Sequence, residues 1–205
     1  MSPSEEPPPE RPEPHAPAPR LGAHAASHDW NVVVTVREGG FHAARRLLRE
    51  WGAVHRSGYL NVLVMRADDP DRLLAQLAER ASGEPEILTY LSRVVPVRST
   101  FSFQSPEEFE SKARAAALEF VPALAGKSFH VRMYRHGFKG RLISAAEERL
   151  LGEVLLGALD EVGAPGRVTF TDPDAILAVV TIGNRAGMSL WTREDLKRYP
   201  FLGLD

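Results

Sequence analysis

A basic segment stands out in the second half of the sequence, where residues 126–141 read GKSFHVRMYRHGFKGR. The segment contains no acidic residue, whereas residues 143–174 carry seven acids against two arginines. The formal net charge of −2 therefore comes from segregated charges and not from evenly mixed ones. A local basic surface of this kind can attract phosphate groups although the whole chain is slightly negative. Its cations are Lys127, Arg132, Arg135, Lys139 and Arg141.

Apolar and polar side chains alternate along a strand that the pattern predicts for residues 128–134. Such a strand buries one set in a core and turns a cation and an aromatic ring to its other face. The two sets are Phe129, Val131 and Met133 on the buried face, and His130, Arg132 and Tyr134 on the other.

A turn at Gly137 is expected to follow this strand, with a loop that leads into the N-terminus of a helix. Unpaired backbone N–H groups and the helix dipole favour phosphate at such a place. The charge pattern alone equally allows the cations to form a solvated rim that pairs with the acidic helix. The residues expected to converge in the loop are Arg135, His136, Lys139 and Arg141.

Other residue pairs of chemical interest have simpler structural explanations. Asp172 and Asp174 flank Pro173 and fit a tight turn better than an acid–base pair. His24 and His28 have metal-binding spacing on a helix, but no carboxylate or cysteine set completes a site, and no metal is expected. Three aromatic residues near the C-terminus are expected to dock the last helix onto the core and not to stack on bases: Trp191, Tyr199 and Phe201.

The composition limits the classes of function. The chain has no cysteine, which excludes disulfides, thiolate metal sites and a cysteine nucleophile. It also lacks a Gly-rich phosphate loop, a GxSxG nucleophile elbow and an HExxH zinc motif, so no catalytic residue and no cofactor is predicted. No apolar stretch approaches the roughly 20 residues of a membrane span, and no secretory signal begins the chain. We expect a cytoplasmic protein.

The first half of the chain divides into a tail and a small α/β domain. Residues 1–28 hold half of all the prolines and several glutamates, which predicts a disordered tail, with a polyproline ligand for a partner as the alternative. Residues 29–103 follow the order strand, helix, strand, strand, helix, strand, with Asp69 as a helix cap and residues 94–103 as the closing strand. This order is that of a ferredoxin-like split βαβ unit.

A second α/β domain is predicted for residues 104–205. Capping-box spacing, Ser105 with Glu108 and Ser144 with Glu147, marks the starts of two helices. The remaining predicted elements are strands at residues 128–134, 167–171 and 175–182 and a short helix at residues 192–199.

The second half resembles a THUMP domain, the RNA-binding module of several tRNA-modifying enzymes, including tRNA thiouridine synthases. The resemblance covers about residues 104–199, and a ferredoxin-like unit commonly precedes THUMP domains. It rests on these segments: Gly126 to Phe129, Val131-Arg132 with Arg135 and Gly137, Glu148-Arg149 within the helix start at residues 144–152, and Thr171 to Asp174.

The resemblance implies that the two domains hold the acceptor stem and 3′ end of tRNA for a catalytic domain. A-form RNA offers phosphates and 2′-hydroxyls that basic loops can grip without reading sequence. Where family members often have consecutive cations before the glycine, this chain has Arg135-His136, so part of its charge is expected to depend on pH. The expected RNA-binding residues are Lys127, Arg132, Tyr134, Arg135, His136, Lys139, Arg141 and Arg193, with Arg198 as a weaker candidate.

The chain ends at residue 205 without room for the catalytic domain of the family's enzymes. The sequence therefore predicts a protein that is not an enzyme and that presents tRNA to a separate tRNA-modifying enzyme. The architecture resembles the eukaryotic adaptor that serves the enzyme making N4-acetylcytidine in tRNA. A regulatory or ligand-sensing protein built on the ferredoxin-like unit, without RNA binding, is the alternative, and a small unrecognised enzyme is a third.

Overall fold

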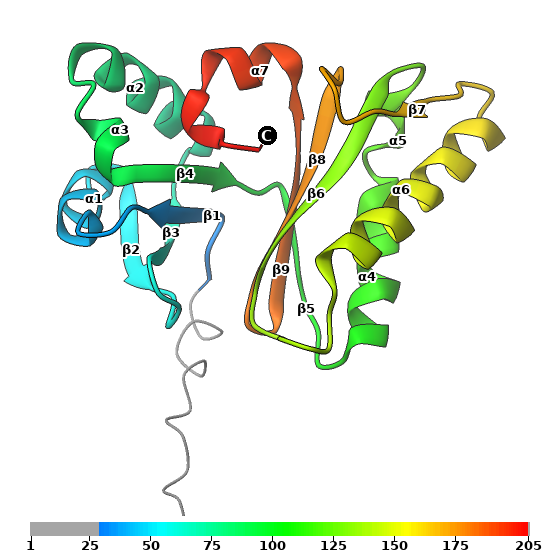
Figure 1. The fold of residues 1–205 in the computed structure, drawn as a ribbon, viewed down its shortest axis with the longest axis horizontal. Coiled ribbons are helices and arrows are strands. Elements are labelled where there is room, and N and C mark those ends of the chain that lie inside the picture. The colour runs from blue at the N-terminus through cyan, green and yellow to red at the C-terminus, as the bar shows by residue number, and fades with distance from the viewer. Residues whose placement is uncertain (1–28, 205) are drawn as a thin grey trace, which may run out of the picture.

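The computed structural model describes residues 29–204, which form a mixed α/β structure with two β-sheets (Figure 1). The predicted disordered tail and the pair His24 and His28 lie outside the described residues. The strand order is β2-β3-β1-β4 in the first sheet and β5-β9-β8-β6-β7 in the second. The α/β class expected from the sequence is therefore confirmed.

The first sheet is antiparallel throughout and has β1 in its interior between β3 and β4. Its two interior strands, β1 and β3, consist almost wholly of β-branched and apolar residues, as expected for a sheet with a buried face. The predicted order of strands and helices is present, with one additional short helix, α3, before the last strand. The elements are β1 (Val32–Val36), α1 (Phe41–Leu48), β2 (Gly52–Arg56), β3 (Val62–Ala67), α2 (Pro70–Gly83), α3 (Ile87–Tyr90) and β4 (Leu91–Pro96).

The second sheet has parallel and antiparallel parts. Strand β6 is parallel to both of its neighbours, β7 and β8, whereas β9 is antiparallel to β8 and to β5. Helices α4 and α6 lie against one face of this sheet (Figure 1). The elements are β5 (Ser99–Ser102), α4 (Pro106–Leu118), α5 (Val121–Leu124), β6 (Ser128–His136), α6 (Ser144–Glu161), β7 (Arg167–Val168), β8 (Ala175–Ile182), β9 (Arg185–Thr192), α7 (Arg193–Arg198) and the 3-10 helix η2 (Pro200–Leu202).

Local capping signals in the sequence mark the starts of α2, α4 and α7. Asp69 accepts hydrogen bonds from the first-turn N–H groups of α2. Ser105 accepts one from the backbone N–H of Glu108, whose carboxylate in turn accepts one from the backbone of Gln104. Thr192 forms a complete capping box at the start of α7. No helix within residues 29–204 is long and apolar enough to cross a membrane.

The predicted capping box at the start of α6 is wrong. Ile143 occupies the N-cap position without a side-chain hydrogen bond, and Ser144 is already the first helical residue. Glu147 is buried, with 6% of the residue exposed, and the helix has no side-chain capping hydrogen bond. Burial and the neighbouring Glu110 raise the pKa of the Glu147 carboxyl above its usual range.

The predicted strand at residues 94–103 is two strands that belong to different sheets. Strand β4 ends at Pro96, and β5 begins at Ser99 and pairs with β9 of the second sheet. The chain crosses from one sheet to the other at Val97, which is buried and whose side chain lies against the backbone of Gly187. A Cβ at position 187 would lie 2.7 Å from Val97, so only glycine fits this crossing. The strand predicted at residues 167–171 is also shorter in the structure, where only β7 (Arg167–Val168) pairs as a strand.

The C-terminal segment packs against the first sheet. Tyr199, Phe201, Leu202 and Leu204 are buried in the same core as strands β1 to β4. Trp191 is also buried there, so the docking role expected for the C-terminal aromatic residues is confirmed. The last residues of the chain therefore tie the two sheets together.

Arg93 of β4 makes the most specific contact of this junction. Its guanidinium lies 3.7 Å from the centre of the Tyr134 ring, and its Nε donates a hydrogen bond of 2.7 Å to the carbonyl of Gly203. The Tyr134 hydroxyl donates to the same carbonyl at 3.0 Å. Strand β4, strand β6 and the C-terminal segment thus meet at one point.

Substitution Arg93→Ala is expected to lower the free energy of unfolding by about 2 kcal/mol, because it removes a cation–π contact and a partly buried hydrogen bond. Chemical denaturation measures this loss. Arg98→Ala is the matched control, since Arg98 forms an exposed ion pair with Asp71 and its loss should cost less than about 1 kcal/mol. Equal losses in the two variants would contradict the role given to Arg93.

Candidate nucleic-acid interface

Strand β6 carries the basic segment through the interior of the second sheet. Phe129, Val131 and Met133 are buried beneath α4 and α6, as the alternation predicts. Glu148 of α6 accepts a hydrogen bond of 2.7 Å from the backbone N–H of Met133, which secures the helix on the strand. The prediction for the buried face of this strand is therefore confirmed.

The opposite face of β6 is only partly open. Tyr134 lies under the Arg93 guanidinium, and its hydroxyl donates a hydrogen bond within the protein. Its ring therefore contributes to the junction between the sheets. Arg132, one alternation earlier on the same face, instead lines a cavity and is partly exposed.

This cavity, called here the β6–α7 cavity, has a volume of about 590 Å³. It lies between the first part of β6, the loop from β7 to β8, and α7 with the C-terminal segment. Arg132, Arg193 and Lys197 supply cationic side chains, and Asp172 is its acidic member. An aromatic side chain, Phe170, also lines it. The cavity thus combines positive charge with an aromatic surface.

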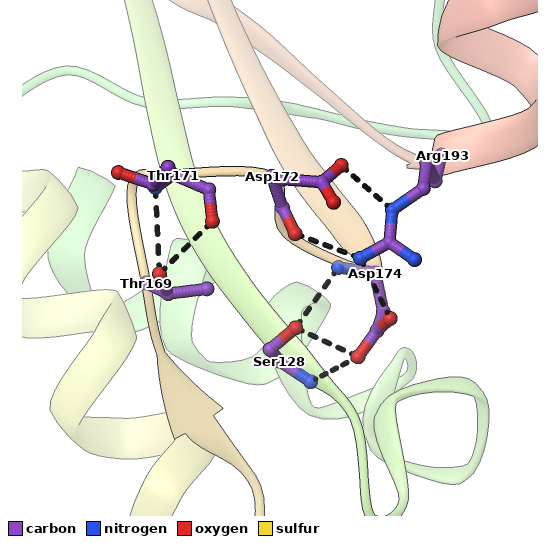
Figure 2. A network of polar contacts seen from close by, with 6 residues as sticks. All are labelled: Ser128, Thr169, Thr171, Asp172, Asp174 and Arg193. Carbon is purple, nitrogen blue, oxygen red and sulfur yellow. Dashed lines mark hydrogen bonds and ion pairs between the residues drawn. The ribbon is translucent and has the colours of Figure 1, made fainter.

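The loop of residues 169–174 is held to the start of β6 by a polar network (Figure 2). The Asp174 carboxylate accepts hydrogen bonds from the backbone N–H and hydroxyl of Ser128, at 2.8 and 2.7 Å. The backbone N–H of Asp174 donates to the Ser128 hydroxyl at 3.0 Å. These hydrogen bonds hold the pKa of the Asp174 carboxyl below its usual range. The tight turn expected around Pro173 is instead a longer loop, because β7 and β8 lie on opposite sides of β6; the chain bends at Asp172, which has a φ of 48°.

Arg193 binds to the same loop, so its guanidinium already has acidic partners within the protein. Its guanidinium donates to the Asp172 carbonyl at 2.7 Å and forms ion pairs with Asp172 and Asp174 at 2.8 and 3.1 Å (Figure 2). The charge of Arg193 is therefore largely balanced by two carboxylates. Its position joins the loop to the start of α7.

The other end of β6 differs from the expected loop. Arg135 and His136 belong to the strand, because β8 continues to pair with β6 as far as His136. The guanidinium of Arg135 donates to the carbonyl of Gly137. His136 packs against Tyr59, with ring centroids 5.8 Å apart, and burial together with Arg93 and Arg135 lowers its pKa. Both effects favour the neutral form of the His136 imidazole.

Lys139 and Arg141 are exposed in the loop that follows, and Arg141 lies over the Phe138 ring at 4.8 Å. Lys127 is exposed at the opposite end of β6. Eight residue steps separate the ends of this strand, which places them roughly 26 Å apart. Of the residues expected in the loop before α6, Lys139 and Arg141 lie there, whereas Arg135 and His136 belong to β6. Arg198, the weaker candidate, is exposed at the end of α7, where its guanidinium lies beside Tyr199.

The sequence interpretation missed Phe170. Its side chain is 72% exposed, and its ring lies 5.3 Å from that of His130. The signal in the sequence is an aromatic residue within the polar turn TFTDPD. A turn of this composition has no apolar face to bury, so its one aromatic ring was a candidate for an exposed position.

Neither a protein-family model nor a curated protein matches the sequence. Three solved structures are similar in fold. PH1313 from Pyrococcus horikoshii Ot3 has 13% sequence identity and a TM-score of 0.56, and the match covers 80% of this chain and 54% of that one. TrmN from Thermus thermophilus has 17% identity and a TM-score of 0.50, with 80% of this chain and 45% of that one covered, and a possible methylase from Clostridium difficile 630 has 12% identity and a TM-score of 0.51, with 78% and 40% covered. The chain spans about half of their length or less, and the likeness is one of fold.

The expectation that the protein is not an enzyme is wrong. It rested on the length of the chain and on the absence of catalytic motifs from the sequence. The same fold forms 40% of a protein described as a possible methylase, and it also occurs in TrmN. The absence of catalytic motifs from this chain therefore does not distinguish a non-enzyme from one part of an enzyme.

Substitution Asp174→Ala is expected to lower the melting temperature at pH 7. Because the pKa of this carboxyl is depressed in the folded state, its contribution is complete above the unfolded pKa of about 3.9 and is lost as the pH falls through the folded value. The difference from the parent protein should therefore shrink below about pH 4. Thermal melts across this range measure it. Glu161→Ala, at an exposed acid, is the control, and a difference that stays constant with pH would argue against the Ser128 contacts as its source.

Proposed function

We propose that the protein binds tRNA, holding the acceptor stem and 3′ end, and presents it to a tRNA-modifying enzyme. In this proposal residues 29–103 are a ferredoxin-like domain and residues 104–205 a THUMP domain. Cytidine acetylation is the candidate reaction, because of the resemblance described above. The proposal concerns the binding step, by which a distant nucleotide of the tRNA is positioned for chemistry.

One observation carries the proposal: none of the five cations in residues 126–141 forms a salt bridge among the described residues. Six other cations, by contrast, are paired with acids in the same part of the chain. The alternative of a rim neutralised by the acidic helix α6 requires such pairs. Cations without acidic partners, spread along β6 and just beyond both of its ends, are available to a polyanion.

The proposed contacts follow the course of β6. Lys127 lies at its first end, Arg132 on its open face, and Lys139 and Arg141 beyond its second end. A backbone of phosphates that runs along the strand would meet cations at both ends, which fits recognition of shape more than of sequence. Arg135, the last cation within β6, donates a hydrogen bond to the carbonyl of Gly137 at the second end of the strand.

Tyr134, His136 and Arg193 have structural parts in this proposal. Tyr134 and His136 pack against residues of the first half, and Arg193 holds the loop of residues 169–174. Their substitution would change affinity by disturbing the positions of other residues. Direct contacts with phosphate are proposed for Lys127, Arg132, Lys139 and Arg141 alone.

Replacement of Lys127, Lys139 and Arg141 by alanine is expected to weaken tRNA binding and flatten its salt dependence. Each lost phosphate contact lowers the magnitude of the slope of log affinity against log salt by about 0.7 to 0.9, so the slope of the triple variant should fall by about 2.1 to 2.7. Fluorescence titrations of tRNA at several salt concentrations, with duplex DNA as competitor, measure the slope. All three side chains are exposed, so the variant should fold.

The matched control replaces Arg46, Arg49 and Arg72, three exposed cations of the first half of the chain that lie outside residues 126–141. This variant loses the same net charge and should keep the slope of the parent protein. Equal effects in the two triple variants would indicate a general charge effect without a defined site. No binding of tRNA at low salt by the parent protein would refute the proposal.

A further inference from the structure

Phe170 presents an aromatic surface to solvent at the mouth of the β6–α7 cavity. Among the large apolar side chains exposed in residues 29–204, it is the only aromatic one. Exposure of a phenyl ring forgoes the stabilisation that its burial would give. A ring in this position is available for offset or edge stacking with a planar ligand that enters the cavity.

The backbone on both sides of Phe170 is fixed. Thr169 donates its N–H to the Phe129 carbonyl at 3.0 Å, and its carbonyl lies 3.0 Å from Nδ1 of His130. The hydroxyl of Thr169 also bonds to the backbone of Thr171, and the loop beyond is tied to Arg193 and Ser128 (Figure 2). The ring is therefore exposed on an ordered loop, so little entropy is lost when a ligand stacks on it.

Three cationic side chains line the same cavity, and one of them is paired with acids. The charge of Arg193 is balanced by Asp172 and Asp174, which leaves Arg132 and Lys197 without ion pairs among the described residues. The Nε of Arg132 is buried and makes no hydrogen bond in this part of the chain. These two cations can pair with phosphate while Phe170 accepts a planar ring.

We propose that the β6–α7 cavity holds an unpaired nucleotide of the RNA, with its base stacked on Phe170 and its phosphate near Arg132 and Lys197. The inference rests on the proposed function and assigns a subsite to it. The cavity volume of about 590 Å³ lies within the range of small-molecule sites. A second hollow of about 400 Å³ also has His130 and Phe170 in its lining, so the ring stands between two open spaces. Stacking of this kind is tolerant of base identity and suits single-stranded RNA.

The test uses two short RNAs with the same duplex, one blunt and one with a four-nucleotide 3′ overhang that carries 2-aminopurine. The overhang RNA should bind the parent protein about tenfold more tightly than the blunt RNA, and its 2-aminopurine fluorescence should be quenched on binding. Phe170→Ala should lose the quenching and the tenfold preference, with unchanged affinity for the blunt duplex. Phe170→Tyr should retain both.

Leu60→Ala is the control, because Leu60 is 90% exposed and distant from the cavity in the β2–β3 hairpin. It should behave as the parent protein does. If Phe170→Ala bound each of the two RNAs with the same affinity as the parent protein, and binding stayed salt-sensitive, the Phe170 subsite would be overturned and the proposed function would stand. Failure of the parent protein to bind either RNA at low salt would overturn both.

Discussion

The parallel pairing of β6 with β8 is the constraint on which the rest of the second half depends. It runs for eight residue pairs, from Phe129 opposite Ala175 to His136 opposite Ile182. Because parallel strands begin at the same edge, the loop before β8 must lie beside the start of β6. The hydrogen bonds between Ser128 and Asp174 hold it there. The crossover through α6 then covers one face and leaves the other for Arg132 and the cavity.

Segregation of charge explains how a slightly acidic chain can carry a basic surface. The acids nearest to β6 are used within the protein: Glu148 bonds to the strand backbone, and Asp172 and Asp174 bind Arg193. These carboxylates therefore do not neutralise the cations of residues 126–141. The net charge of the whole chain consequently says little about the partner. The ion pairs say more, because they separate cations that already have an acidic partner from cations that can still bind a phosphate.

The junction between the sheets links the proposed interface to the first half of the chain. Arg93 and the carbonyl of Gly203 meet Tyr134 of β6, and the C-terminal segment buries its aromatic residues against β4. The cavity is bounded by this same segment, so its shape depends on how the C-terminus is docked. Residues far from any phosphate can in this way affect how RNA would be held.

The sequence by itself determined most helices and strands, the caps at Asp69 and Ser105, and the alternation that buries Phe129 and its neighbours. These features depend on residues a few positions apart, which a single chain displays directly. The sequence also identified the cations in and beside β6, but not how far apart they lie in three dimensions. Only the tertiary structure decided that residues 94–103 divide between two sheets, that Tyr134 is covered by Arg93, and that Phe170 is left open. Each of these outcomes depends on partners distant in the sequence, such as Gly203, 69 residues from Tyr134, and no local pattern specifies which residues will meet.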